Sequence, residues 1–271
     1  MTISIYAKTF YLNNAFHQKG RLFTEKHDMS PNKTFSHDDD LIKITSLPEF
    51  YQELSRIKFD DPHSVYVSRH IKKLSIGEGT RIGPHVYFIG NISIGPGCII
   101  GPETYIKDSE MGRENRIRFS YIVSTLIGEG NVIGPQTLIE YANIGDRNEF
   151  GFTTQIKRCH FGDENTAKHH CYIGNARVGN RVNFGAGFVT CNYDGGAEKK
   201  ITIIEDGAFP GVNVNAIAPI RIGRESYSGA GSTIKTNVPP HAVVVGGGGL
   251  GRILKNKKSR RTDTGWTITE K

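Results

Sequence analysis

The feature that most constrains the fold of this chain is a six-residue repeat that runs through most of its length. Aliphatic or aromatic residues, often followed by glycine, recur every five or six positions between Ile76 and Ile234. Three steps sum to 16–18 residues, and this larger period is 17 from Ile127 to Val178. One step predicts a short strand and a turn, so three steps predict a triangular coil, and coils stack at the roughly 4.8 Å spacing of paired strands. The sequence therefore predicts a solenoid of about nine coils.

Glycines mark the predicted corners of these coils. We interpret them as turn residues that tolerate unusual backbone angles; they are Gly128, Gly134, Gly145, Gly151, Gly162, Gly174, Gly179 and Gly185. The repeat loses its phase once, after Thr190. The segment 191–203 fits no coil and predicts a loop that leaves the solenoid, which is a favoured place for function.

Both ends of the chain lack the repeat. Ser46-Leu47-Pro48-Glu49 has a capping-box pattern, and apolar residues follow it at helical spacing, which predicts a short helix near 47–58. We expect three regions: a small N-terminal α/β cap over 1–70, the solenoid over 71–245, and a flexible basic tail over 246–271.

Charge and composition exclude some classes of function. The net charge of +7 comes mostly from 252–261, which holds six basic residues and no acidic one. Such a tail suits a phosphorylated cofactor as well as nucleic acid, and we predict no nucleic-acid partner. No stretch of 18 apolar residues predicts a membrane span, and 1–10 lacks a signal-peptide pattern. Four scattered cysteines are typical of a cytoplasmic protein with reduced thiols.

Reactive side chains are densest between Lys157 and Asp194. His169 and His170 are adjacent, so on a strand they would point to opposite faces. Together with His160 they form no set of separated ligands, and we predict no metal site. Nothing in the sequence marks Cys171 as an activated thiol.

The Ile-Gly pairs followed by four variable residues resemble the hexapeptide-repeat acyltransferase superfamily. This resemblance implies an all-β, left-handed parallel β-helix. The stretch from Gly151 to Gly231 is similar, more specifically, to the acetyltransferase domains of the bacterial bifunctional enzymes that make UDP-N-acetylglucosamine. Three segments carry it: 167–174 (AKHHCYIG), 182–187 (VNFGAG) and 190–195 (TCNYDG).

The resemblance implies a function for the whole domain. That function is an acetyl-CoA-dependent N-acetyltransferase acting on an amino-sugar phosphate such as glucosamine-1-phosphate. It also implies a cytoplasmic homotrimer with its sites at subunit boundaries.

The resemblance further implies roles for single residues. His169 matches a general base that accepts the proton of the sugar amine, Asn192 a residue that orients the imidazole, and Ala186 a backbone amide that stabilises the oxyanion. The matching substrate-binding residues are Lys157, Tyr172 and Asn183, with Lys199 and Lys200 around one further phosphate-binding lysine. The matching CoA-binding residues are Tyr193 and Ala230, and Arg252 is a substitute for a missing arginine.

Several positions depart from the family pattern. Ile139 followed by Glu140 stands where the family has an arginine for the sugar phosphate. Val212 replaces a serine that touches the reacting centre, and Gly247 replaces an arginine for CoA. Residues 1–70 are too short for a uridylyltransferase domain, so we expect that activity to be absent.

Two other functions remain open. The run from His170-Cys171 to Asn175 is faintly similar to the His-x-Cys pattern of sugar-nucleotide O- or N-acyltransferases of the lipid A type. The lost arginine and serine are also compatible with a non-catalytic homologue that binds a sugar phosphate or a protein.

Overall fold

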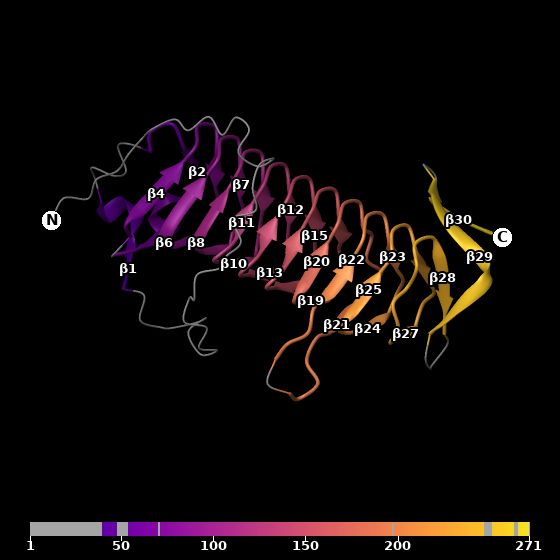
Figure 1. Cartoon of the computed structure of the whole chain (residues 1–271). Helices are drawn as coiled ribbons and strands as arrows, with labels where there is room; N and C mark the ends of the chain where they lie inside the picture. The colour runs from indigo at the N-terminus through magenta and orange to yellow at the C-terminus, as the bar shows by residue number, and fades with distance from the viewer. Residues whose placement is uncertain are drawn as a thin grey trace.

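The protein is a parallel β-solenoid of about ten turns, as Figure 1 shows. The computed structural model describes residues 40–47, 54–69, 71–196, 198–246, 251–262 and 265–270. The described residues contain strands and two short 3-10 turns but no α-helix. The predicted all-β solenoid is therefore confirmed. It has about one coil more than we expected, because parallel pairing begins at Lys58 and not at Ile76.

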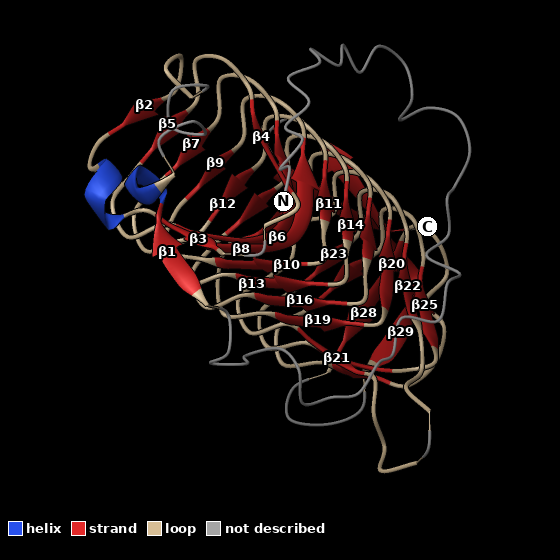
Figure 2. Cartoon of the chain, turned by 90° about the vertical axis from the view of Figure 1, so that its left-hand side faces the viewer, coloured by secondary structure: helices blue, strands red, loops and turns tan. Residues whose placement is uncertain are grey.

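Three parallel sheets form the sides of the coils, seen almost along the solenoid axis in Figure 2. Face one contains β2 (Lys58–Phe59), β5 (Arg81–Ile82), β7 (Ile99–Ile100), β9 (Arg116–Ile117), β12 (Val132–Ile133), β15 (Glu149–Phe150), β18 (Thr166–Ala167), β23 (Phe209–Pro210), β26 (Tyr227–Ser228) and β28 (Ala242–Val245). Face two contains β3 (Tyr66–Ser68), β6 (Tyr87–Ile94), β8 (Tyr105–Met111), β10 (Tyr121–Val123), β13 (Leu138–Glu140), β16 (Gln155–Lys157), β19 (Tyr172–Gly174), β21 (Val189–Cys191), β24 (Asn215–Ile217) and β27 (Thr233–Ile234).

Face three begins with β4 and takes in the second halves of β6 and β8, which continue around a corner. Its strands are β4 (Lys73–Ile76), β11 (Leu126–Ile127), β14 (Asn143–Ile144), β17 (His160–Phe161), β20 (Ala176–Val178), β22 (Thr202–Ile204) and β25 (Ile220–Ile222).

The core is a set of stacked columns, one for each face. On face two, Ile122, Ile139, Ile156 and Ile173 lie in register on successive strands, and all four are fully buried. Burying one such side chain contributes about 1.5–3 kcal/mol, so the repeat of apolar residues drives the stacking. The inward positions are those that the six-residue series predicted.

A buried ladder of asparagines joins four coils at one corner. Asn131 donates its N–H and its amide nitrogen to the side-chain oxygen of Asn115, at 2.9 and 3.0 Å. Asn148 repeats both bonds to Asn131, and Asn165 repeats them to Asn148. The amide side chains thus satisfy corner N–H groups that the strands leave unpaired.

The glycines play a different role from the one we expected. Most of them do not have a positive φ; a Cβ at Gly145, for example, would lie 2.6 Å from a carbonyl oxygen of the next coil. The left-handed corner positions belong instead to charged residues such as Arg147, Glu164 and Arg181. Each of these donates its N–H to a carbonyl of the preceding coil, so pairing between coils overrides the local backbone preference.

At the N-terminal end, β1 (Leu41–Lys43) pairs antiparallel with β3, followed by η1 (Ile44–Ser46). A second 3-10 turn, η2 (Pro62–Ser64), precedes β3. The predicted helix near 47–58 is wrong where it can be compared: 54–57 form turns and 58–59 a strand, while 48–53 lie outside the described residues. Pairing of β2 with β5 claims this segment for the first coil.

At the C-terminal end, β29 (Arg252–Thr262) and β30 (Gly265–Glu270) form an antiparallel hairpin. The ring of Trp266 lies 5.8 Å from that of Phe209 and 5.9 Å from that of Tyr227. The expected flexible tail is therefore wrong for the described part of 251–270. The hairpin pairs with β28, which would otherwise be an open edge of face one.

We predict that the asparagine ladder is a main source of stability. Asn148→Ala removes the acceptor of the N–H and the amide nitrogen of buried Asn165, and should lower the free energy of unfolding by about 2–4 kcal/mol. Asn180→Ala removes an exposed side chain that also accepts one backbone N–H, and should cost less than about 1 kcal/mol because water replaces it. Urea titrations measure both values; equal losses would contradict the prediction.

Candidate active site

The two residues predicted to act on the thioester, His169 and Ala186, lie one coil apart at the corner between faces one and two. The N–H of Gly187 donates to the carbonyl of His169 at 3.2 Å, which fixes this register. Equivalent bonds place Val212 after Ala186 and Ala230 after Val212. We call Phe152, His169, Ala186, Val212 and Ala230 the corner column; it brings three predicted site residues into one line.

Both histidines lie in the turn between β18 and β19, not on a strand. The expectation that strand geometry sends them to opposite faces is therefore wrong. His170 takes the left-handed corner position, with a φ of 33°, and donates its N–H to the carbonyl of Phe152 at 2.7 Å. His169 occupies the preceding position, and its side chain is exposed. The corner, not strand alternation, separates the two imidazoles.

The Gly185-Ala186-Gly187 turn leaves one backbone donor available. Gly185 donates to the carbonyl of Pro210 and Gly187 to that of His169. Within the described part of the chain, the N–H of Ala186 has no acceptor. A Cβ at Gly185 would lie 2.3 Å from the carbonyl carbon of Gly211, so only glycine allows this close approach of the two coils. A free N–H in a rigid turn is suited to bind a developing negative charge.

Apolar side chains border this part of the corner column. Phe152 precedes His169 and is 58% exposed, and Val212 follows Ala186 and is 44% exposed. Sequence reasoning did not assign Phe152 to the site, although it lies 17 residues before His169, one coil period away. A large apolar ring on the surface beside an imidazole can exclude water from a bound ligand.

On face two, Tyr172 and Asn192 meet over Gly174. A Cβ at Gly174 would lie 2.6 Å from the hydroxyl of Tyr172 and 2.7 Å from the amide nitrogen of Asn192. Glycine therefore lets both polar groups close over the strand. Asn192 is buried and donates its amide nitrogen to Asn175 at 3.1 Å, so in this structure it is Asn175, and not the imidazole of His169, that holds it.

Lys157 lies on the same face, beside Gly174, and is paired with a carboxylate. The register of β13 and β16 places Glu140 opposite Lys157, and their Oε2 and Nζ atoms are 3.0 Å apart. Gln155 also donates to Glu140 Oε2, at 3.4 Å. The Glu140 side chain is 2% exposed and that of Lys157 is 24% exposed. The position that departed from the family pattern is thus Glu140, one coil from Lys157 on the same face.

The loop that interrupts the repeat spans residues 192–201, between β21 and β22, and projects from the solenoid in Figure 1. Its base is closed by a bond from the N–H of Lys200 to the carbonyl of Asn192 at 2.8 Å. Lys200 forms an ion pair with Asp194, which lowers the pKa of that carboxyl. The Nζ atom of Lys199 lies 5.8 Å from the ring centre of Tyr193. The loop thus carries two predicted lysines that already have contacts within it.

Two other predicted residues lie apart from this group. Asn183 forms a bridge with Thr166 on face one, on the other side of the corner from Tyr172. Arg252 lies in register with Val245 of β28, next to the strand that leads to Ala230. Within a single chain, the structure does not bring Asn183 onto the face of Lys157 and Tyr172.

Cys171 follows the two histidines but is buried in the core. Burial raises the pKa of its thiol, so the reactive thiolate is disfavoured. This supports our interpretation that it is not a nucleophile. In the described ranges, no three His, Cys, Asp or Glu side chains are grouped so that they could hold a metal ion, and no helix is long and apolar enough to cross a membrane.

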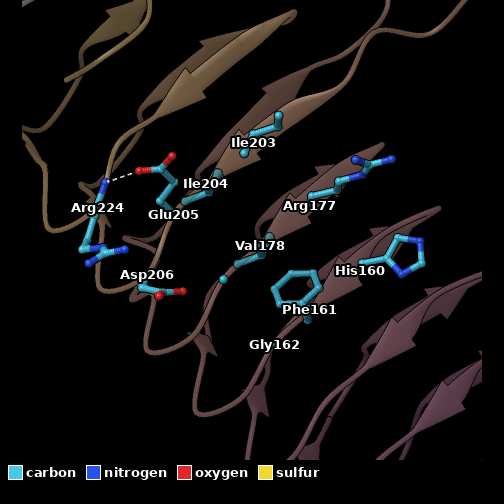
Figure 3. Close-up of a pocket in the computed structure, with 11 residues that line it drawn as sticks. His160, Phe161, Gly162, Arg177, Val178, Ile203, Ile204, Glu205, Asp206 and Arg224 are labelled. Carbon is cyan, nitrogen blue, oxygen red and sulfur yellow. Dashed lines mark hydrogen bonds between the residues drawn. The ribbon is translucent and has the colours of Figure 1, made fainter. Parts of the chain in front are cut away.

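An open depression of about 500 Å³ lies elsewhere, on face three (Figure 3). Its lining includes His160, Arg177 and Glu205, which accepts a bond from the N–H of Arg224 at 2.9 Å. Burial and the nearby Arg177 lower the pKa of His160. None of the predicted site residues lines this depression, so its size does not locate the chemistry.

Comparison with known proteins agrees with the repeat and the corner column. Residues 74–108 match the family of bacterial transferase hexapeptide repeats (six repeats). The chain belongs to the hexapeptide-repeat transferases.

Within this class it is homologous to the bifunctional protein GlmU. It is 40% identical to GlmU of Carboxydothermus hydrogenoformans over 68% of this chain and 41% of that one. It is 33% identical to GlmU of Thermotoga maritima over 97% of this chain and 57% of that one. The chain thus spans about half the length of these curated relatives.

Solved structures show weaker likeness. The UDP-N-acetylglucosamine acyltransferase of Francisella novicida is 16% identical over 74% of this chain and 68% of that one, with a TM-score of 0.47. That of Arabidopsis is 17% identical over 74% of this chain and 73% of that one, with a TM-score of 0.48. Scores of this size carry no argument about function.

We predict that the core thiols make the protein sensitive to alkali. Burial raises the pKa of Cys98 to about 11 and that of Cys159 to about 12. An unfolded thiol ionises near pH 8.5, so above that pH the unfolded chain binds fewer protons and the free energy of unfolding falls, by up to about 1.4 kcal/mol per pH unit and thiol.

Urea titrations at pH 8 and pH 10 measure this loss in the wild type and in Cys159→Ala. The variant has a cavity and starts less stable, but its loss between the two pH values should be smaller. Equal losses would contradict the assignment.

Proposed function

We propose that this chain is an acetyl-CoA-dependent N-acetyltransferase that acts on an amino sugar. The observation that carries the proposal is the corner column, in which His169 lies one coil from an Ala186 N–H that has no acceptor in the described chain. Homology to GlmU, over about half of its length, supports the same reaction.

In the proposed reaction the sugar amine attacks the thioester carbonyl carbon of acetyl-CoA. His169 accepts the proton that the amine loses, because a neutral imidazole is a base near pH 7. The N–H of Ala186 donates to the oxygen on which negative charge develops. The C–S bond then breaks, and CoA leaves as the thiol after taking up a proton. No metal is needed in this scheme.

We assign the remaining residues by their place along the solenoid. Tyr172, Lys157 and Asn192 lie on face two and would hold the sugar, with Lys199 and Lys200 on the loop beside them. Ala230 and Arg252 lie towards the C-terminal end and would meet CoA, as would Tyr193. Asn183 lies on face one and would reach a sugar only from the other side of the corner, or in a neighbouring chain.

We predict that replacing His169 removes most of the activity. His169→Asn should lower kcat by about 100- to 10,000-fold, the usual contribution of a general base. The matched control is His170→Asn, which changes the neighbouring imidazole and keeps a residue type that tolerates the left-handed corner. It should stay within a few-fold of the wild type. Release of CoA thiol from acetyl-CoA and glucosamine measures both, and equal rates in all three proteins would contradict the assignment.

A non-catalytic role has one observation in its favour. Val212 presents an exposed apolar side chain in the corner column, where a hydroxyl group would be expected to assist acyl transfer. Calorimetric titration with CoA separates the two functions. A folded protein that binds no CoA would favour the non-catalytic role, and binding would favour the transferase.

We also propose a homotrimer, in which a neighbouring chain supplies the second wall of the site. Face two carries an outward column of aromatic rings that includes the stacked pair Tyr66 and Tyr87, with centres 5.3 Å apart. Such a surface is suited to an interface. Light scattering should give three times the chain mass of 30.0 kDa; a monomer mass would contradict this prediction.

A further inference from the structure

We propose that the acceptor is an amino sugar without a phosphate group, and that Glu140 sets this specificity. In this proposal a sugar hydroxyl, and not a phosphate, contacts Lys157. The inference rests on the proposed function, since it names the substrate class of the same site. It is carried by the ion pair between Glu140 and Lys157.

Glu140 is built into the sheet and cannot easily turn away from Lys157. It lies at the end of β13 in register with Lys157, and only 2% of its side chain is exposed. Its Oε2 atom accepts bonds from both Lys157 and Gln155. The charge of the ammonium group is therefore already neutralised at 3.0 Å by a carboxylate of the same chain.

A phosphate group would meet unfavourable charge at this place. A phosphate monoester carries about −1.5 to −2 charges at neutral pH. One that contacted Lys157 would lie beside the Glu140 carboxylate, in a partly buried position where like charges repel more strongly than in water. Lys200, on the loop, is likewise paired, with Asp194. Two of the three lysines assigned to a phosphate are thus neutralised within the chain.

The same groups suit a hydroxyl-rich neutral ligand. An ammonium group has three N–H donors, of which the pair with Glu140 uses one. Tyr172, whose hydroxyl lies over Gly174 beside this pair, both donates and accepts. Sugar hydroxyls can bond to such a mixture without bringing a charge that the site must compensate.

The test is calorimetric titration of the full chain, in the presence of CoA, with glucosamine and with glucosamine-1-phosphate. The wild type should bind glucosamine at least as tightly as the phosphate ester. Glu140→Gln keeps the shape of the side chain but removes its charge, and should tighten binding of the phosphate ester about 10-fold. Glucosamine binding should change by less than about threefold.

The matched control is Glu164→Gln, which removes a carboxylate paired with Arg147 at an exposed corner away from this site. It should bind both sugars as the wild type does. Tighter wild-type binding of the phosphate ester, binding of neither sugar, or no effect of Glu140→Gln on the phosphate ester would each overturn the inference. The wild-type comparison decides the matter even if Glu140→Gln fails to fold.

The assay also separates this inference from the proposed function. Turnover of acetyl-CoA with a preference for glucosamine-1-phosphate would overturn the inference and leave the transferase intact. Preferential binding of glucosamine without any release of CoA thiol, from this or other amino sugars, would do the reverse.

Discussion

The structure depends on the pairing of each coil with the next. Every strand in the middle of the solenoid gives its N–H and carbonyl groups to the coils before and after it, so the number of residues per coil cannot drift without breaking the ladders. Ile139, for example, is held between Ile122 and Ile156 on face two. Residues that do not fit this count must leave the solenoid, and the loop over 192–201 does so between two strands that keep their register.

This constraint explains why so much could be predicted from the sequence. A fixed period places the inward residues of every coil, and it also places His169 and Ala186, which are 17 residues apart, one above the other. The same arithmetic would have found Phe152, and would have placed Glu140 beside Lys157 rather than leaving the position shared with Ile139. What the period could not supply was the direction of side chains at corners, where the chain turns and strand alternation no longer applies.

The predictions that were wrong relied on local signals. A capping pattern predicted a helix near 47–58, but pairing of Lys58 and Phe59 with the next coil claims the end of that segment. A run of basic residues predicted a flexible tail, but the hairpin there is anchored by Trp266, which packs on rings from two coils far back in the sequence. In both regions contacts between distant residues outweighed what neighbouring residues indicated.

The pair of Glu140 and Lys157 is difficult to explain by stability. Taking two charges out of water costs about as much as their attraction returns, so a buried ion pair in a sheet gives little advantage over apolar residues of the same size. The columns on either side show that such residues fit this scaffold, because Val123 occupies the position one coil before Glu140 and is buried. A carboxylate at this level is therefore better explained by what it does to Lys157. It removes the net charge from one side of the site while leaving the ammonium donors in place, and thereby selects ligands by their charge without changing the fold.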